Sequence, residues 1–300
     1  MEHFKSGFGT IIGRTNVGKS TLLNALVGEQ VAITTNKPQT TRTAVKAIVN
    51  RDNSQIVFID TPGIHKPKSK LGGVLNETAF QSILDVDFVL FLIEADSKEI
   101  GKGDSLILDK LKESNKKVIL VINKIDLVKK QELLRLIQKY NELYMFEAVV
   151  PISAMQKKGI DELVTEIEKI IPEGPAYYDK EEYTDQTMRQ LVEEKIREKA
   201  LKLLQDEVPH GIYVEVSKMK KRKTRERQEI FDIEATIFCQ RNSHKGIIIG
   251  KDGQMLKKIG TFARKDLERD FGTKINLSLW VKVRENWQDD ELIIKRFKLE

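Results

Sequence analysis

The segment GRTNVGKS at residues 13–20 constrains the fold more than any other part of the chain. It follows the strand-like run FGTIIG and opens the helix-like run STLLNALVG, a context in which this spacing predicts a phosphate-binding loop. Glycines let successive backbone N–H groups turn toward phosphates, and the amino terminus of the helix adds a favourable dipole. We expect Lys19 to neutralise the β- and γ-phosphates and Ser20 to hold Mg²⁺.

From Phe8 to about Ile171, short apolar runs alternate with amphipathic stretches, which predicts strands and crossover helices. Several of the apolar runs lack polar residues on either face, as is typical of parallel strands covered by helices on both sides. The predicted strands are FGTIIG, AVKAIVN, QIVFID, DFVLFLIEA, KVILVIN and AVVPIS, and helices are expected over KGDSLILDKLKES, KKQELLRLIQKYNELY and KKGIDELVTEIEKII. The fold class predicted for residues 1–172 is α/β, with a doubly wound sheet.

A second motif, Asn123-Lys124-Ile125-Asp126, ends the run KVILVIN and so falls at the same sheet edge as the phosphate-binding loop. The Asp126 carboxylate can accept both hydrogen bonds from N1–H and the exocyclic amine of guanine, a paired donor edge that adenine lacks. Ser153 and Ala154, after the last predicted strand, are expected to contact guanine through backbone amides. The motif therefore predicts binding of GTP and GDP rather than ATP.

Two further segments are expected to sense the γ-phosphate. Asp60-Thr61-Pro62-Gly63 ends the run QIVFID, so Asp60 can bind Mg²⁺ through water while the Gly63 amide reaches the γ-phosphate. The segment TTNKPQTTR offers Thr40 or Thr41 as a Mg²⁺ ligand in the triphosphate state, and we favour Thr41; a threonine-rich surface loop is the alternative. Loss of the γ-phosphate would release both segments, which makes a switch.

The predicted site residues fall into three groups. The nucleotide-binding residues are Gly13, Arg14, Thr15, Asn16, Val17, Gly18, Lys19, Ser20, Thr21, Asp60, Thr61, Pro62, Gly63, Ile64, Asn123, Lys124, Asp126, Ser153 and Ala154. The Mg²⁺ ligands are Ser20, Thr41 and Asp60, and the catalytic residues are Asn16, Lys19 and Thr41.

The stretch IPEGPAYYDKEEYTDQT breaks the periodic pattern, so we expect a linker at 173–185 and a second domain at 186–300. A long helix, MRQLVEEKIREKALKLLQDEV, is followed by the strands GIYVEVSKM and EIFDIEATIFCQ, joined by the basic run KKRKTRER. A short helix around Ser243 to Ile249, the loop GKDG, a helix from about Gln254 to Arg269 and the strand KINLSLWVKV complete an α-β-β-α-α-β order.

Positive charge is concentrated in this second domain. Residues 211–288 contain 18 Lys plus Arg against 10 Asp plus Glu, a net +8, although the whole chain carries only +6. A basic surplus confined to one module indicates a polyanionic partner, and a solvated basic face is the alternative. The basic run from Lys220 to Arg227 could clamp RNA or form a mobile hairpin tip.

The loop GKDG suits a nucleic-acid backbone, because glycines permit close approach and nearby lysines can pair with phosphates. Residues Ile247 to Ile249 are expected in the core, with an apolar groove floor as the alternative. Asp252 adds a negative charge and is expected to reduce affinity. The predicted RNA-binding residues are Lys245, Gly246, Ile249, Gly250, Lys251, Asp252, Gly253 and Lys257.

These motifs in this order resemble the translation-factor-like P-loop GTPases, in particular the Era family, and the second domain resembles an α+β type II KH domain. The resemblance covers nearly the whole chain. It implies a slow GTPase that uses Mg²⁺, binds single-stranded RNA at the 3′ end of small-subunit ribosomal RNA, and acts in assembly of the 30S ribosomal subunit. No oligomeric state is predicted, because neither the sequence nor the resemblance indicates one.

Two residues depart from common GTPase patterns. Ile64 occupies the place where many GTPases have a glutamine that orients water, so unaided hydrolysis should be slow. In related GTPases with a hydrophobic residue there, an asparagine placed like Asn16 helps to bind K⁺, and the resemblance implies the same here. Thr15 replaces the proline usual in the family and spares every contacting group.

Two alternative functions remain open: a nucleotide-gated RNA-binding module with negligible turnover, and a membrane-associated signalling GTPase. The sequence has no signal-peptide pattern and no stretch of transmembrane length, so we expect a cytoplasmic protein, with peripheral association at the inner face of the membrane as the alternative. The single cysteine, Cys239, excludes an intramolecular disulfide and is expected to pack in the core.

Overall fold

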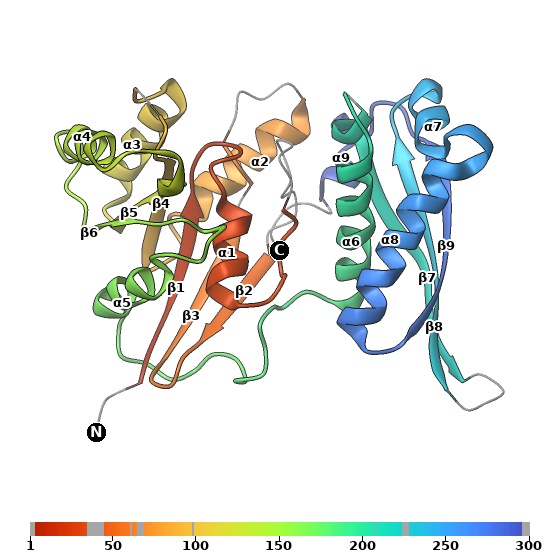
Figure 1. The fold of residues 1–300 in the computed structure, drawn as a ribbon, viewed down its shortest axis with the longest axis horizontal. Helices are drawn as coiled ribbons and strands as arrows, with labels where there is room; N and C mark the ends of the chain where they lie inside the picture. Colours follow the sequence, from red (N-terminus) through yellow and green to blue (C-terminus); the bar gives the residue numbers. More distant parts are fainter. Residues whose placement is uncertain are drawn as a thin grey trace. The chain divides into compact units, whose positions relative to one another are not determined.

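The structure is a computed structural model that describes residues 4–34, 45–60, 62–64, 69–97, 99–206, 208–223 and 228–295. The chain forms two compact units that divide between Asp185 and Gln186, and the second unit extends to Ile293. We call them unit 1 and unit 2 and treat each by itself (Figure 1).

Unit 1 contains a six-stranded sheet in the order β2-β3-β1-β4-β5-β6. The strands are β1 (Lys5–Ile12), β2 (Val45–Asn50), β3 (Ser54–Asp60), β4 (Phe88–Glu94), β5 (Lys117–Asn123) and β6 (Ala148–Pro151). Each of them matches a predicted strand. All neighbours pair in parallel except β2 and β3, which are antiparallel because the chain reverses tightly between them, with the Arg51 amide donating to Ser54 O at 2.9 Å.

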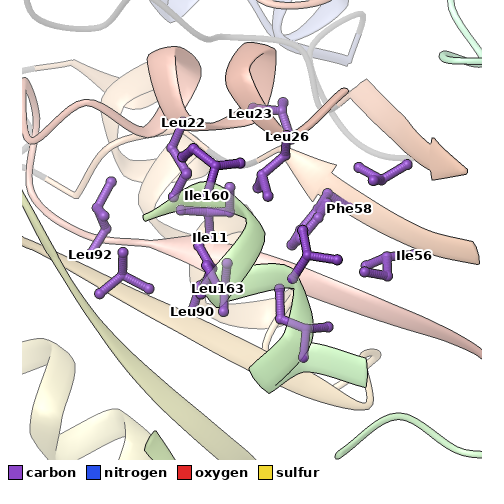
Figure 2. Packing of buried hydrophobic residues seen from close by; sticks show 14 of the residues in the cluster. Ile11, Leu22, Leu23, Leu26, Ile56, Phe58, Leu90, Leu92, Ile160 and Leu163 are labelled. Atoms are coloured by element: carbon purple, nitrogen blue, oxygen red, sulfur yellow. The ribbon is translucent and has the colours of Figure 1, made fainter. Parts of the chain in front are cut away.

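Five α-helices cover the two faces of this sheet: α1 (Lys19–Val27), α2 (Lys70–Gln81), α3 (Lys102–Ser114), α4 (Lys130–Asn141) and α5 (Ile160–Ile170). One buried cluster joins α1 and α5 to the sheet, and another joins α2, α3 and α4 to the opposite face. Figure 2 shows the first cluster, in which Ile11 of β1 lies among Leu22 of α1 and Leu163 of α5. This arrangement confirms the predicted doubly wound α/β fold.

Residues 173–185, expected as a linker, are hydrogen bonded to the edge of the unit 1 sheet. The buried Gln55 carboxamide accepts from the amides of Tyr177 and Tyr178 at 2.7 and 3.0 Å and donates to Tyr178 O at 2.8 Å. Farther along, the Ile48 amide of β2 donates to Tyr183 O at 3.1 Å. The segment therefore belongs to unit 1 and covers an edge strand that would otherwise present unpaired backbone groups.

Unit 2 has the predicted α-β-β-α-α-β order: α6 (Met188–Leu203), β7 (Ile212–Lys223), β8 (Glu229–Cys239), α7 (Asn242–Ile249), α8 (Gln254–Phe271) and β9 (Lys274–Val283). In the sheet β7-β8-β9, the first pair is antiparallel and the second parallel. Alternate residues of β8, from Ile233 to Cys239, are buried against the helices. Helix α6 ends at Leu203, earlier than the predicted end at Val208, and Asp206 beyond it has a positive φ of 54°.

The single cysteine is packed in unit 2, as predicted: Cys239 is free and fully buried at the end of β8. Burial raises the pKa of its thiol. Within the described residues, no helix is both long and apolar enough to cross a membrane.

Candidate nucleotide site and nucleic-acid groove

Two glycines of the GRTNVGKS loop occupy positions where no side chain would fit. Gly18, which precedes α1, has a φ of 101°, and a Cβ atom there would lie 2.3 Å from Asn123 Nδ2. A Cβ atom on Gly13 would lie 2.4 Å from the carbonyl oxygen of Leu92. The loop therefore runs close against the ends of β4 and β5, and the amino terminus of α1 opens directly from it.

The loop lysine is buried beside the segment that follows β3. Lys19 is 7% exposed, and its ammonium donates to Gly13 O at 3.1 Å and Arg14 O at 2.8 Å. A Cβ atom on Gly63 would lie 2.9 Å from Lys19 Nζ. The lysine predicted to meet the phosphates and the glycine predicted to sense the γ-phosphate are thus brought together.

The residues of the NKID motif differ in their surroundings: two are hydrogen bonded to neighbouring loops and one is exposed to solvent. Asn123 is 3% exposed, donates to Val17 O at 2.9 Å and accepts from the Ala154 amide at 3.0 Å. Lys124 donates to Asn16 O at 3.1 Å and also pairs with Glu94. Asp126, by contrast, is exposed to solvent. Asn123 and Lys124 therefore hold the loops of this edge together, and Asp126 is the member of the motif that is exposed to solvent.

The backbone amides of Ser153 and Ala154, expected to contact guanine, already donate within the protein. The Ser153 amide donates to Lys158 O at 3.0 Å, and the Ala154 amide donates to Asn123 Oδ1. Ser153 and Lys158 form a small bridge that closes the turn between β6 and α5. These two residues shape the loop in this structure, and their contact with guanine stays a prediction.

The segment after β3 begins beside the phosphate-binding loop. Asp60 ends β3 in register with Ile11 of β1, and the Ile64 amide donates to Gly13 O at 3.3 Å. The Ile64 side chain is 4% exposed and packs in the cluster formed by α2, α3 and α4. Thr40, Thr41 and Thr61 lie outside the described residues, as does the side chain of Asp60.

The Arg14 side chain turns away from the loop toward α3. Its Nε donates to Asp104 Oδ1 at 3.0 Å, and Nη2 donates to Ser97 Oγ at 3.0 Å. Sequence reasoning included Arg14 among the nucleotide-binding residues and missed Asp104 and Ser97. No motif marked either residue, because the contact depends on how the chain folds.

The GKDG loop of unit 2 is built from left-handed backbone conformations. Gly250 has a φ of 71°, and a Cβ atom there would lie 2.7 Å from Met255 Cβ. Asp252 has a φ of 50° and Gly253 a φ of 73°. Aspartate tolerates this region better than most residues, so the geometry gives a backbone reason for Asp252 at this position.

A groove of about 450 Å³ lies beside this loop, between α8 and β9. Its lining residues are Gly253, Leu256, Lys257, Gly260, Thr261, Arg264, Leu277 and Leu279. A Cβ atom on Gly260 would lie 3.3 Å from Leu279 Cδ1, so this glycine lets the helix approach the strand closely. Apolar leucines with two exposed cations suit unpaired bases and their phosphates.

The apolar run before the GKDG loop is divided among three environments. Ile248 is fully buried, Ile249 packs partly buried against the core, and Ile247 is half exposed. The core prediction was therefore wrong for Ile247, because consecutive helical positions point in different directions. The leucines in the groove come instead from α8 and β9, which sequence reasoning missed although Gly260 within a helical pattern was a usable signal.

The basic run from Lys220 to Arg227 begins within β7 and is partly neutralised. Lys221 pairs with Glu229 at 2.6 Å and Arg222 pairs with Asp232, and Lys218, just before the run, pairs with Glu234 at 2.8 Å. Strand β7 extends to Lys223, so the first part of the run is strand rather than loop. Residues 224–227 lie outside the described part of the chain.

Comparison with known proteins gives the same two modules. A family model described as 50S ribosome-binding GTPase matches residues 9–124, and a KH domain model matches residues 207–288. The chain is 51% identical to GTPase Era of Thermoanaerobacter sp. over 97% of this chain and 95% of that protein. It is 50% identical to GTPase Era of Clostridium kluyveri over 97% and 98%, respectively.

Two solved structures are similar over nearly their whole length. One is a variant of Aquifex aeolicus Era bound to GDP and aluminium fluoride, with a TM-score of 0.92, 38% identity and coverage of 98% of this chain and 99% of that one. The other is Era in complex with MgGDPNP and a segment of 16S ribosomal RNA, with a TM-score of 0.94, 40% identity and the same coverage. From the full-length identity and the two matching modules, the chain belongs to the Era family of GTPases.

Proposed function

We propose that unit 1 binds GTP and hydrolyses it to GDP and phosphate, and that unit 2 binds single-stranded RNA at the 3′ end of small-subunit ribosomal RNA during 30S subunit assembly. The observation that carries the proposal is the closeness of Lys19 Nζ to Gly63, with 2.9 Å to a Cβ atom built there. A buried ammonium beside the Gly63 backbone suits recognition of a γ-phosphate, with the lysine pairing with its charge and the Gly63 amide donating to it.

The residues of the loop fit a polyphosphate. Gly13 and Gly18 let the loop pack closely where it enters α1. At the amino terminus of that helix, N–H groups and the helix dipole favour anions. Lys19 would exchange its carbonyl partners for phosphate oxygens. Mg²⁺, when bound, would supply further positive charge, and Ser20, Asp60 and Thr41 are the residues proposed to hold it.

Guanine selection is assigned to Asp126. Its carboxylate is exposed to solvent. Asn123 and Lys124 of the same motif donate to the backbone oxygens of Val17 and Asn16, so the motif is held beside the phosphate-binding loop. A carboxylate that accepts two hydrogen bonds from guanine would face the acceptor N1 of adenine, and this mismatch is costly.

Hydrolysis is expected to be slow unaided. Ile64 is directed into the core and has no group that could orient water. Asn16, exposed at the turn of the loop with a φ of 68°, is the residue proposed to help hold K⁺, which would supply positive charge near the phosphates. Turnover of wild type and Asn16→Ala is compared in potassium and in sodium. If the variant keeps the wild-type ratio of the two rates, the potassium proposal fails.

RNA binding is assigned to the α8–β9 groove and the GKDG loop. The leucine floor offers apolar contact to unpaired bases, and Lys257 and Arg264 offer cations to the backbone. We propose a cytoplasmic site of action. Liposome flotation tests the alternative of peripheral membrane association, with retention on vesicles as its expected result.

The experiment that tests the RNA assignment is crosslinking and sequencing of bound RNA with GTP or GDP present. Wild type is compared with a Gly250→Asp, Gly253→Asp variant. We expect recovery of small-subunit RNA ends from the wild type in GTP and loss of that recovery in the variant. Equal recovery from the variant would contradict the assignment of the loop.

A further inference from the structure

The guanidinium of Arg14 is held at two points outside the phosphate-binding loop. Nε donates to Asp104 Oδ1 at the start of α3, and Nη2 donates to Ser97 Oγ after β4, both at 3.0 Å. A charged group with two directed hydrogen bonds has little freedom to change its position. The first residue after Gly13 is therefore tied to α3 and to the segment that follows β4.

The Arg14 side chain packs closely against Gly103 at the start of α3. A Cβ atom on Gly103 would lie 3.0 Å from Arg14 Cδ and 3.1 Å from Cγ, and one on Gly101 would lie 3.5 Å from Nη1. Neither glycine has a positive φ, so backbone strain does not account for them. Gly103 instead leaves space for the alkyl part of the arginine, whereas a Cβ atom on Gly101 would make only an ordinary van der Waals contact.

The carboxylate that binds Arg14 is deeply buried. Asp104 is 0% exposed, and burial, the largest influence on it, raises its pKa, while the charge of Arg14 and the hydroxyl of Tyr140 oppose the shift. Tyr140 of α4 is itself fully buried. A carboxylate in such surroundings is costly without its partner, which favours the paired arrangement over an accidental surface contact.

The same loop residue that is tied to α3 also supports the loop lysine. Arg14 O accepts from Lys19 Nζ at 2.8 Å, and the neighbouring Gly13 O accepts from both Lys19 Nζ and the Ile64 amide. A shift of Arg14 would therefore move the carbonyl oxygens that set the direction of Lys19. The guanine-reading Asp126 shares none of these bonds.

We propose that Arg14 and Asp104, with the space left by Gly103, are positioning residues that fix the phosphate-binding loop for hydrolysis. This inference rests on the proposed role of Lys19 at the phosphates. It assigns to the pair an effect on the chemical step and none on the choice of base. Misplacing reacting groups by about 1 Å can cost about 100-fold in rate, so the effect is measurable.

The test compares kcat, KM and the GTP-over-ATP preference of four variants. Arg14→Ala removes the guanidinium, and Arg14→Lys keeps the positive charge but cannot make both hydrogen bonds of the guanidinium. Gly103→Ala keeps every polar group but crowds the Arg14 side chain. Gly73→Ala, also inside a helix, is the matched control, because a Cβ atom there meets nothing within 4 Å. Circular dichroism checks that each variant is folded.

We expect Arg14→Ala and Gly103→Ala each to lower kcat by about 10- to 100-fold, with the GTP-over-ATP preference unchanged. A variant that combines Arg14→Ala with Gly103→Ala should be no slower than the slower of the two single variants, because both changes disturb the same contact. Arg14→Lys should recover part of the rate, and Gly73→Ala should match wild type.

The proposal is overturned if folded Gly103→Ala keeps kcat within about twofold of wild type, or if the two effects simply multiply. If Arg14→Ala does not fold, Arg14→Lys and Gly103→Ala still decide, since neither leaves Asp104 without a positive neighbour. Lys19→Ala distinguishes failure of the proposed phosphate site from failure of the positioning role of Arg14. Turnover that survives that change would remove the assigned phosphate site itself, whatever the Arg14 variants do.

Discussion

Asn123 Nδ2 donates to the backbone oxygen of Val17 at 2.9 Å, so the end of β5 is bonded directly to the phosphate-binding loop. Asn123 Oδ1 completes a bridge by accepting from the Ala154 amide at 3.0 Å. One buried side chain thus joins three loops that are far apart in sequence. Residue 18 must be glycine for this contact, because a Cβ atom there would collide with the same carboxamide.

Asn123→Ala removes both bonds and leaves two buried backbone groups without their partner. We expect the affinities for GTP and GDP to fall by similar factors of about 10, or ~1.4 kcal/mol, because the bridge supports the loops in both states. Titration calorimetry measures both. Asn141→Ala, at the exposed end of α4, is the control and should bind as wild type does. A loss confined to one nucleotide would contradict the bridging role.

Ile64→Gln tests whether a glutamine at this place can restore water positioning. Because Ile64 lies in an apolar cluster, we expect no increase in turnover and a loss of unit 1 stability of about 1–3 kcal/mol from burying an amide. Both tryptophans, Trp280 and Trp287, belong to unit 2, so hydrogen exchange of α2 and α3 is the suitable readout. Faster turnover with unchanged exchange would show that the side chain can leave the core.

Strand positions in both units were predictable from the sequence because apolar runs of that length leave few alternatives. Helix α2 was not singled out, since KLGGVLNETAFQ carries two adjacent glycines that weaken a helical pattern. The attachment of residues 173–185 to β2 and β3 depends on Gln55, whose polarity gave no hint that its carboxamide is buried and fully used.

The nucleotide site was predictable as a set of motifs, because the carboxyl ends of parallel strands meet at one edge. The hydrogen bonds that its residues make with one another were not predictable. Asn123 braces loops, Ser153 and Ala154 use their amides internally, and Arg14 binds Asp104, all of which depend on side-chain packing. In unit 2, Leu277 and Leu279 became visible as a groove only once β9 lay beside α8.

Asp252→Asn tests the negative charge in the GKDG loop. Asparagine also tolerates the left-handed conformation at a φ of 50°, so the change removes charge without straining the backbone. We expect RNA affinity to rise about two- to fivefold at low salt, with the gain shrinking as salt increases. Fluorescence anisotropy with a single-stranded RNA measures this.

The matched control for that change is Asp206→Asn, which alters an exposed aspartate of unit 2 with a similar φ of 54° outside the α8–β9 groove. It should alter RNA affinity much less. An equal gain from both variants would mean that only the overall charge of unit 2 matters, and the local role of Asp252 would be lost.

Cys239 provides a pH-dependent probe of unit 2. Since burial raises its pKa above the ordinary value of 9.0, less thiolate is present at a given pH than in a free cysteine. We expect iodoacetamide to label the native protein slowly at pH 8, with the rate still increasing above pH 9.0, and to label the urea-unfolded protein rapidly. Equal rates in the native and unfolded protein would contradict the buried position.

We propose that unit 1 selects guanine through the exposed Asp126 carboxylate. Calorimetric titration of wild type and Asp126→Asn with GTP and with ATP tests it most directly. We expect wild type to bind GTP at least about 100-fold more tightly than ATP, and Asp126→Asn to abolish most of this difference. Similar affinities for the two nucleotides in wild type, or an unchanged preference in the variant, would contradict it.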